Sequence, residues 1–135
     1  MKKYQIVFAI AMGVAGGMLL AQTEADLPNI MKSVAATGKA AKGDVAAKNK
    51  DGVIAAGKTY ESNFKQVEAF FSKRGTADGA GWAKTNHMAA TAMIAAANAG
   101  DFDKAGTELA TITGSCNTCH TAHREGEKGG PYKVK

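Results

Sequence analysis

A regular apolar seam runs through the last third of the chain. Its members follow one another at alternating intervals of three and four residues: Phe102, Ala105, Leu109, Ile112, Cys116, Cys119 and His123. This spacing places all of them on one face of a helix, and it is typical of a helix packed against others in a bundle. No segment of the chain shows the period-two alternation that would predict a half-buried strand. We therefore predict an all-α fold.

Three further helices are predicted upstream of the seam, separated by glycine-bearing breaks. They cover residues 25–41, 45–72 and 80–99. Asp44 is expected to cap the second helix, and Gly100-Asp101 to end the third helix and begin the fourth. Four amphipathic segments with short connections predict an antiparallel four-helix bundle.

The composition supports helices but leaves the core thin. The chain has 27 alanines and only 2 prolines, which favours helix. Only 21 larger apolar side chains follow residue 21, few for a domain of this size, so another group is expected to help fill the interior. We predict one bundle domain over residues 22–124 and a flexible polar tail over 125–135.

The first 21 residues are typical of a secretory signal peptide. Lys2 and Lys3 precede an uncharged apolar run, Ile6–Ala21, which ends at the small residue Ala21, and a second possible cut follows Ala25. We expect cleavage after Ala21 and export to the periplasm. The alternative is an uncleaved membrane anchor, but the run is shorter than the ~20 residues of a spanning helix, so no stable membrane insertion is expected.

Charge and motif content exclude several classes of function. The formal charge is +5, and it falls to +3 without Lys2 and Lys3. The remaining lysines are scattered among acidic residues, with no arginine-rich run, so nucleic-acid binding is not expected. The chain has no paired carboxylates, serine–histidine–acid set or phosphate loop, so we do not predict an enzyme.

Both cysteines of the chain lie in one Cys-x-x-Cys-His motif, Cys116 to His120. This is the signature of c-type haem attachment: the two sulfurs share a helix face and can form thioethers, and His120 can bind the iron as proximal ligand. We predict one covalently attached haem c. Three alternatives have less support. A thioredoxin-like redox pair would need a βαβ context, and a structural disulfide would need a longer loop to be stabilising. A zinc site would need further ligands.

The signal peptide, the four helices and the C-terminal motif followed by Thr121-Ala122-His123-Arg124 resemble the class II cytochromes c, the cytochrome c′ and cytochrome c-556 group. The resemblance implies a bundle around a single haem c, with Arg124 near the proximal His120, where it could tune the iron. The alternative for Arg124 is a solvated arginine that complements the helix dipole. The family typically has an aromatic residue at the position of His123.

The two branches of this family differ in the sixth iron ligand. The c-556-like members have a methionine on the first helix, and the segment from Leu27 to Lys32 resembles that form, with Met31 in the ligand position. Met31 also lies on the apolar stripe that faces the bundle interior, and a thioether suits haem iron. The alternative is that Met31 only fills the core.

Other methionines and histidines are less suited to be the sixth iron ligand. Core packing explains Met88 and Met93, a lone helical His87 is typical of the surface, and His123 follows His120 too closely to reach the opposite face of a haem. Aromatic side chains on the second and third helices are predicted as pocket walls or simply as core: Tyr60, Phe64, Phe71 and Trp82.

These expectations predict an exported one-electron carrier with His120 and Met31 as iron ligands. It would meet redox partner proteins in transient contacts. The alternative is a c′-like five-coordinate protein that binds nitric oxide or carbon monoxide, and a third class is a sensor or scaffold with structural haem. The resemblance also allows a homodimer through the outer faces of the first two helices.

Overall fold

The structure, a computed structural model, describes residues 23–126 and 133–135. The predicted signal peptide lies outside the described residues. None of the helices in the described part of the chain is long and apolar enough to cross a membrane. The elements follow in the order α1 (Leu27–Ala46), α2 (Lys50–Lys73), α3 (Ala77–Asn98), α4 (Phe102–His123), β1 (Arg124–Glu125) and β2 (Lys133–Val134).

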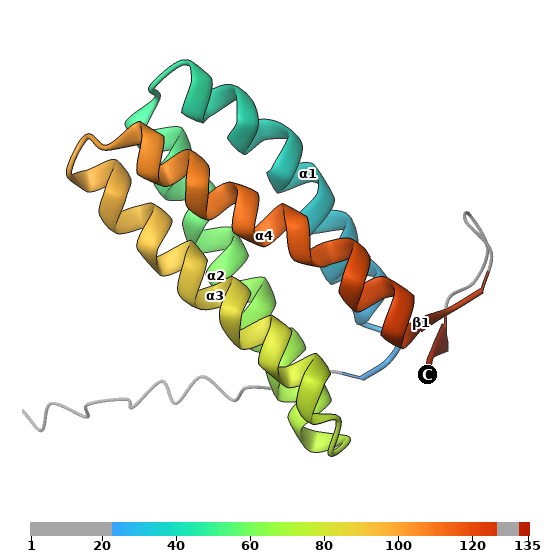
Figure 1. Ribbon diagram of the computed structural model, residues 1–135. Coiled ribbons are helices and arrows are strands. Elements are labelled where there is room, and N and C mark those ends of the chain that lie inside the picture. Colours follow the sequence, from blue (N-terminus) through green and yellow to red (C-terminus); the bar gives the residue numbers. More distant parts are fainter. Residues whose placement is uncertain (1–22, 127–132) are drawn as a thin grey trace, which may run out of the picture.

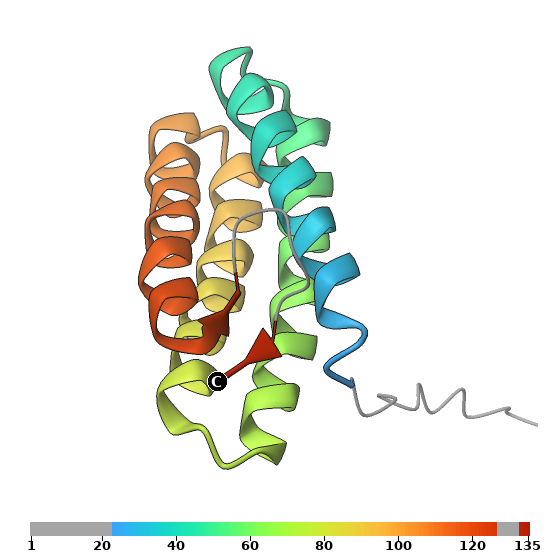
Figure 2. The ribbon, with the colours of Figure 1, turned by 90° about the vertical axis from the view of Figure 1, so that its right-hand side faces the viewer.

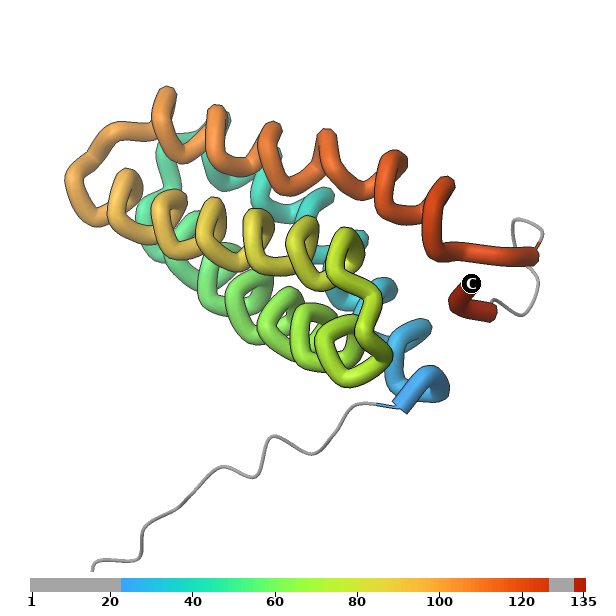
Figure 3. The backbone as a smooth tube through the Cα atoms, turned by 60° about the horizontal axis from the view of Figure 1, so that its bottom comes forward, coloured from blue at the N-terminus to red at the C-terminus, as the bar shows by residue number. Residues whose placement is uncertain are grey.

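The four helices run alternately up and down and pack against one another, which confirms the predicted helical bundle (Figure 1). Each of the three connections between helices is three residues long, so consecutive helices are antiparallel neighbours (Figure 3). The α2–α3 pair has the closest packing, and α1 and α4 pack least closely among the neighbouring pairs. The bundle is therefore most open along the α1–α4 edge.

Helix α1 begins at Leu27, two residues later than predicted, and the predicted boundary between α3 and α4 is confirmed by its glycine and its capping residue. Pro28 lies in the first turn of α1, where its missing N–H costs no hydrogen bond. Gly100 has a φ of 75°, a conformation that glycine adopts without strain. The next residue, Asp101, accepts a hydrogen bond from the Lys104 backbone N–H at 2.9 Å and starts α4.

The predicted break between the first two helices is wrong. Helix α1 continues to Ala46, and Asn49 rather than Asp44 caps α2, accepting from the Gly52 backbone N–H at 3.3 Å. Asp44 lies inside α1 and accepts a hydrogen bond from the Asn49 side chain at 2.8 Å. The turn is made instead at Lys48, which has a φ of 53°.

Helix α3 starts three residues earlier than predicted, at Ala77. The polar, glycine-rich composition of this stretch predicted a loop, but Gly79 packs in the first turn of α3 against Phe71 of α2. A Cβ on Gly79 would lie 2.7 Å from the Phe71 ring. The glycine therefore permits a close contact between two helices rather than breaking one.

The core is built from the predicted faces. Helix α3 contributes Ala89, Met93 and Ala96 to the core, and α2 contributes six apolar side chains of one face: Val53, Ala56, Tyr60, Phe64, Val67 and Phe71. Along α4 the seam is buried at Ala105, Leu109 and Ile112 but only partly buried from Cys116 onward. The lower half of α4 thus faces space that side chains do not fill.

The described parts of the C-terminal segment are paired with each other. Arg124 of β1 lies opposite Val134 of β2 in a short antiparallel ladder. The ladder lies beside the lower ends of α4 and α1 (Figure 2). The backbone N–H of Val134 donates to Glu24 at 2.9 Å, and that of Lys135 donates to the carbonyl of His123 at 3.0 Å. These bonds tether the end of the chain where the sequence alone predicts a loose tail.

Candidate functional site

A cavity of about 460 Å³ lies inside the bundle and opens along its side. Its volume is in the range of ligand pockets. Its walls are mostly apolar and come from all four helices. Apart from the titratable groups of the motif, Lys39 and Lys42 are the only charged side chains among the described residues that line it. Three of the four predicted wall aromatics line this cavity: Tyr60, Phe64 and Trp82.

The Cys-x-x-Cys-His motif lies on the α4 wall of this cavity. Cys116, Cys119 and His120 all line it, and each is only partly buried. The two thiols are free, and the Cys116 Sγ lies 3.4 Å from the carbonyl oxygen of Ile112. A spacing of three residues on a helix directs both sulfurs to the same face. The two thiols and the imidazole of the motif therefore line the same cavity.

The cavity changes the acid–base properties of the motif. Burial raises the pKa of the Cys119 thiol to about 11, and the neighbouring Cys116 and Asp78 add to this shift. Burial also raises the pKa of Cys116. A redox or nucleophilic cysteine needs a lowered pKa that favours the thiolate. The raised values argue against a thioredoxin-like role for this pair.

The pKa of His120 is shifted downward, whereas the pKa values of the two thiols are shifted upward. Burial, and then the positive charge of Arg124, lower its pKa below the ordinary value. A lowered pKa keeps the ring neutral, which is the form that binds a metal ion. The arrangement thus presents two protonated thiols and a neutral imidazole to the same cavity.

Met31 lines the same cavity from α1. It is partly buried and packs against the edge of the hydrophobic core, while its neighbours on the stripe, Ile30 and Val34, are buried. Met31 and His120 also share the lining of a second cavity, of about 330 Å³. The structure therefore brings together the two side chains that the sequence predicts as iron ligands, from helices at opposite ends of the chain.

The second cavity is bordered by the paired C-terminal residues. Val134 and Lys133 line it together with Phe71 of α2 and Arg124. Arg124 ends α4, where its backbone N–H donates to the carbonyl of His120. The charge of Arg124 lowers the pKa of His120, and Arg124 lines the second cavity together with that histidine. The structure therefore places Arg124 beside the predicted proximal ligand.

His123 is held in an aromatic box at the end of α4. Its ring centroid lies 5.0 Å from that of Phe71 and 5.6 Å from that of Trp82. Its Nε2 lies 3.1 Å from a carboxylate oxygen of Asp78. This packing accounts for an imidazole where the resembled family typically has an aromatic side chain.

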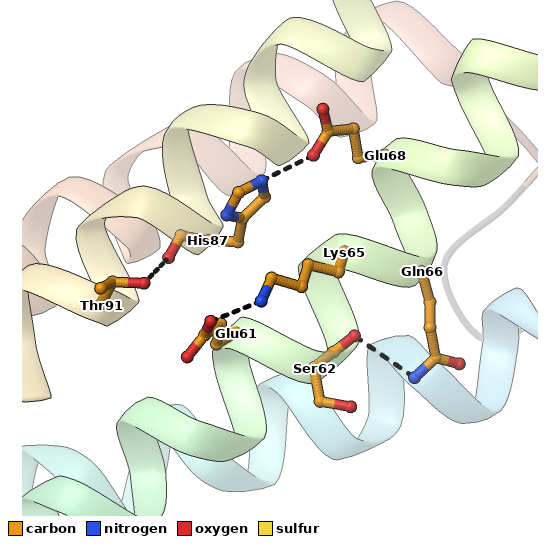
Figure 4. Close-up of polar contacts among 7 residues, drawn as sticks. All are labelled: Glu61, Ser62, Lys65, Gln66, Glu68, His87 and Thr91. Atoms are coloured by element: carbon orange, nitrogen blue, oxygen red, sulfur yellow. Dashed lines mark hydrogen bonds and ion pairs between the residues drawn. The ribbon is translucent and has the colours of Figure 1, made fainter. Parts of the chain in front are cut away.

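The remaining predicted alternatives for the sixth ligand lie away from the cavities. The Nε2 of His87 lies 2.6 Å from Glu68, a contact between α3 and α2 shown in Figure 4, and His87 lines neither cavity. Met93 is fully buried in the core, as predicted. The core role predicted for Met88 is wrong, because that side chain is 57% exposed.

Tyr60 shows the most unusual polar group of the cavity wall. Its side chain is 1% exposed, and its hydroxyl is the only fully buried side-chain polar atom among the described residues without a hydrogen-bond partner. Burial raises the pKa of Tyr60 to about 12, and Cys116 adds to this shift. The hydroxyl lies against Gly38, where a Cβ would approach it to 2.8 Å. An unpaired buried donor is costly, which points to a partner supplied by a ligand.

Sequence reasoning missed part of this wall. Gly38 and Lys42 continue the face of α1 that starts at Met31 and Ala35, so the helical period could have found them. Asn86 was missed because its role is tertiary: its side-chain oxygen accepts from the Ser115 hydroxyl at 2.9 Å across α3 and α4. No sequence signal identifies such a contact.

Comparison with known proteins adds no relative: no protein-family model, no curated protein and no solved structure matches this chain.

Proposed function

We propose that the chain is an exported c-type cytochrome that carries one electron on a single haem c. The observation that carries the proposal is the shared cavity: both thiols of Cys116 and Cys119, the imidazole of His120 and the thioether of Met31 line one apolar volume. The resemblance to class II cytochromes c, in particular the c-556 form, agrees with this arrangement. Bound haem supplies a one-electron couple between ferric and ferrous iron.

The residues present fit a haem. Cys116 and Cys119 would hold it as thioethers, and their protonated state suits addition across vinyl groups, in which each S–H hydrogen passes to the neighbouring carbon. His120 would offer a neutral nitrogen to the iron, since burial, and then the charge of Arg124, lower the pKa of that ring. The apolar walls would exclude water, and the unpaired hydroxyl of Tyr60 offers a hydrogen bond.

Met31 decides between the two functions that the resemblance allows. As sixth ligand it would keep the iron six-coordinate in both oxidation states, which suits electron transfer. The alternative, binding of nitric oxide or carbon monoxide to an open iron, requires that Met31 stay off the metal. The second cavity beside Met31 and His120 offers space for such a ligand.

The absorption spectrum of the ferrous protein tests this proposal. We expect a sharp low-spin α band that carbon monoxide does not alter, and Met31→Ala is expected to give a high-spin spectrum that carbon monoxide shifts. Met88→Ala is the matched control, because that methionine is exposed. A high-spin wild-type spectrum that responds to carbon monoxide favours the gas-binding alternative, and a chain without covalent haem overturns both.

A further inference from the structure

Helix α1 carries a row of lysines along the edge of both cavities. The row has four members at positions i, i+3, i+7 and i+10: Lys32, Ala35, Lys39 and Lys42. This spacing places them on one face of the helix. Lys39 and Lys42 line the first cavity, Lys32 lines the second, and Ala35 lines both. All four residues are exposed. We call these residues the basic rim.

The positive charge of the basic rim is not neutralised by its surroundings. Among the residues that the structure describes, no carboxylate lines the first cavity, and no ion pair includes any of the three lysines. One carboxylate, Glu24, lines the second cavity. It already accepts from the Val134 backbone at 2.9 Å and lies 3.6 Å from Arg74. The rim therefore presents unpaired cations to anything that fills the cavities.

A second observation points to an acceptor at the same wall. The unpaired hydroxyl of Tyr60 lies against Gly38, the residue that precedes Lys39 in the rim. A buried donor and two unpaired cations, Lys39 and Lys42, thus border the first cavity on its α1 side, and Lys32 borders the second. Such a site suits a flat apolar ligand with carboxylate groups at one edge.

We propose that the basic rim binds the two propionate carboxylates of the prosthetic group. This inference rests on the proposed haem, whose propionates lie at the edge opposite its vinyl groups. With the vinyl edge held by Cys116 and Cys119 on α4, the carboxylate edge lies away from these thiols. The lysines that line the first cavity both belong to α1. The rim then fixes the orientation of the macrocycle as well as its charge balance.

Measuring non-covalent binding separates the contribution of the two carboxylates to the affinity from that of the macrocycle. The full chain with Cys116→Ala and Cys119→Ala keeps His120 and is titrated with ferric haem or with its dimethyl ester, in which both carboxylates are blocked. The free acid is expected to bind roughly tenfold more tightly than the ester, since two exposed ion pairs contribute modestly. Replacing all three rim lysines by glutamine is expected to remove this preference and leave ester binding unchanged.

The matched control replaces three other exposed lysines by glutamine: Lys58, Lys84 and Lys104. These line neither cavity and belong to no ion pair among the described residues, so the net charge changes equally. Equal losses in the two triple variants overturn the inference. Binding of acid and ester with the same affinity also overturns it while leaving the haem proposal intact. Failure to bind either compound overturns both.

The holoprotein provides a second measurement that does not require the thiol-free chain to fold. Acetylation of lysines, followed by mass spectrometry, is expected to modify the rim lysines several-fold more slowly than Lys58, Lys84 and Lys104, because paired ammonium groups react slowly. Equal rates contradict the inference. They are the result expected if the rim instead awaits an acidic partner protein.

Discussion

The two ends of the bundle differ in how completely they are filled. At the end with the α1–α2 and α3–α4 connections, three small or medium side chains are fully buried: Ala41, Val53 and Ala97. At the other end, the cavity is lined by Cys119 and His120. We call these the packed end and the cavity end. Both are made from the same four helices. The difference lies in the size of the side chains and in how closely they let the helices approach.

Small residues close the packed end. Gly57 of α2 lies so close to α3 that a Cβ would be 2.5 Å from the Ile94 Cγ1 and 3.2 Å from the carbonyl oxygen of Ala90. Backbones at this distance leave no room for a ligand. At the cavity end the aromatic side chains of Tyr60, Phe64 and Trp82 line the space between the helices without filling it. The alanine-rich composition therefore has different consequences at the two ends.

Removing the haem is expected to have the largest effect on this contrast. The thiol-free chain prepared without haem should unfold at a temperature lower by roughly 15 °C or more than the holoprotein, since a ligand bound only by the native state stabilises it. In hydrogen exchange the amides around Met31 should lose protection while those around Val53 keep it. Equal melting temperatures would contradict the proposed role of the cavity.

Two methionines compare the ends directly in the haem-free chain. Met93→Ala removes a fully buried side chain and is expected to cost about 2–5 kcal/mol of the free energy of unfolding. Met31→Ala only enlarges an existing cavity and is expected to cost about 1 kcal/mol or less. Urea denaturation measures both values. Similar costs would show that the cavity end closes when no ligand is present.

The hydroxyl of Tyr60 predicts an alkaline weakness at the cavity wall of the haem-free chain. Its pKa is about 12 in the fold against 10.0 for an unperturbed tyrosine. Stability from the neutral phenol is complete below pH 10 and is lost as the pH rises to 12, by an amount on the order of 2 kcal/mol. Tyr60→Phe is expected to remove this part of the pH dependence. An unchanged profile of unfolding free energy in that variant contradicts the prediction.

Two helical glycines provide the smallest test. Gly57→Ala forces a Cβ against the Ile94 Cγ1 and is expected to cost about 1–2 kcal/mol, because the Ile94 side chain must shift while the backbone oxygen of Ala90 also lies close. Gly43→Ala meets nothing within 4 Å and is expected to stabilise α1 by about 0.5–1 kcal/mol. Thermal unfolding compares the two. Stabilisation by Gly57→Ala would mean that the packed end tolerates more volume than it shows.

Most helices could be predicted from the sequence because their signals are local. The seam of α4 and the cap at Asp101 depend on residues within a few positions of one another, and both are confirmed. The break at Asp44 was wrong because a glycine and a capping residue are also compatible with a helix interior. The turn was decided instead by Lys48 and Asn49, whose roles depend on how α1 meets α2.

The candidate site divides in the same way. Cys116, Cys119 and His120 are identified by spacing alone, because one helical turn must place both sulfurs on one face. The unpaired hydroxyl of Tyr60 could not be recognised, since it acquires its meaning from a neighbouring helix. The helical period places the lysines of the basic rim on one face of α1, but only the packing of the helices shows that this face borders the cavities. The Asn86–Ser115 contact joins residues 29 positions apart and has no sequence signature.

The sequence by itself determined that the chain forms amphipathic helices and that both cysteines and His120 share one Cys-x-x-Cys-His motif, because helical period and motif spacing are properties of short segments. Only the tertiary structure decided that Met31 and His120 line one cavity, that Met88 is exposed, and that the end of the chain folds back beside the site. These features depend on how closely helices approach one another. That distance is set by side chains from different helices acting together.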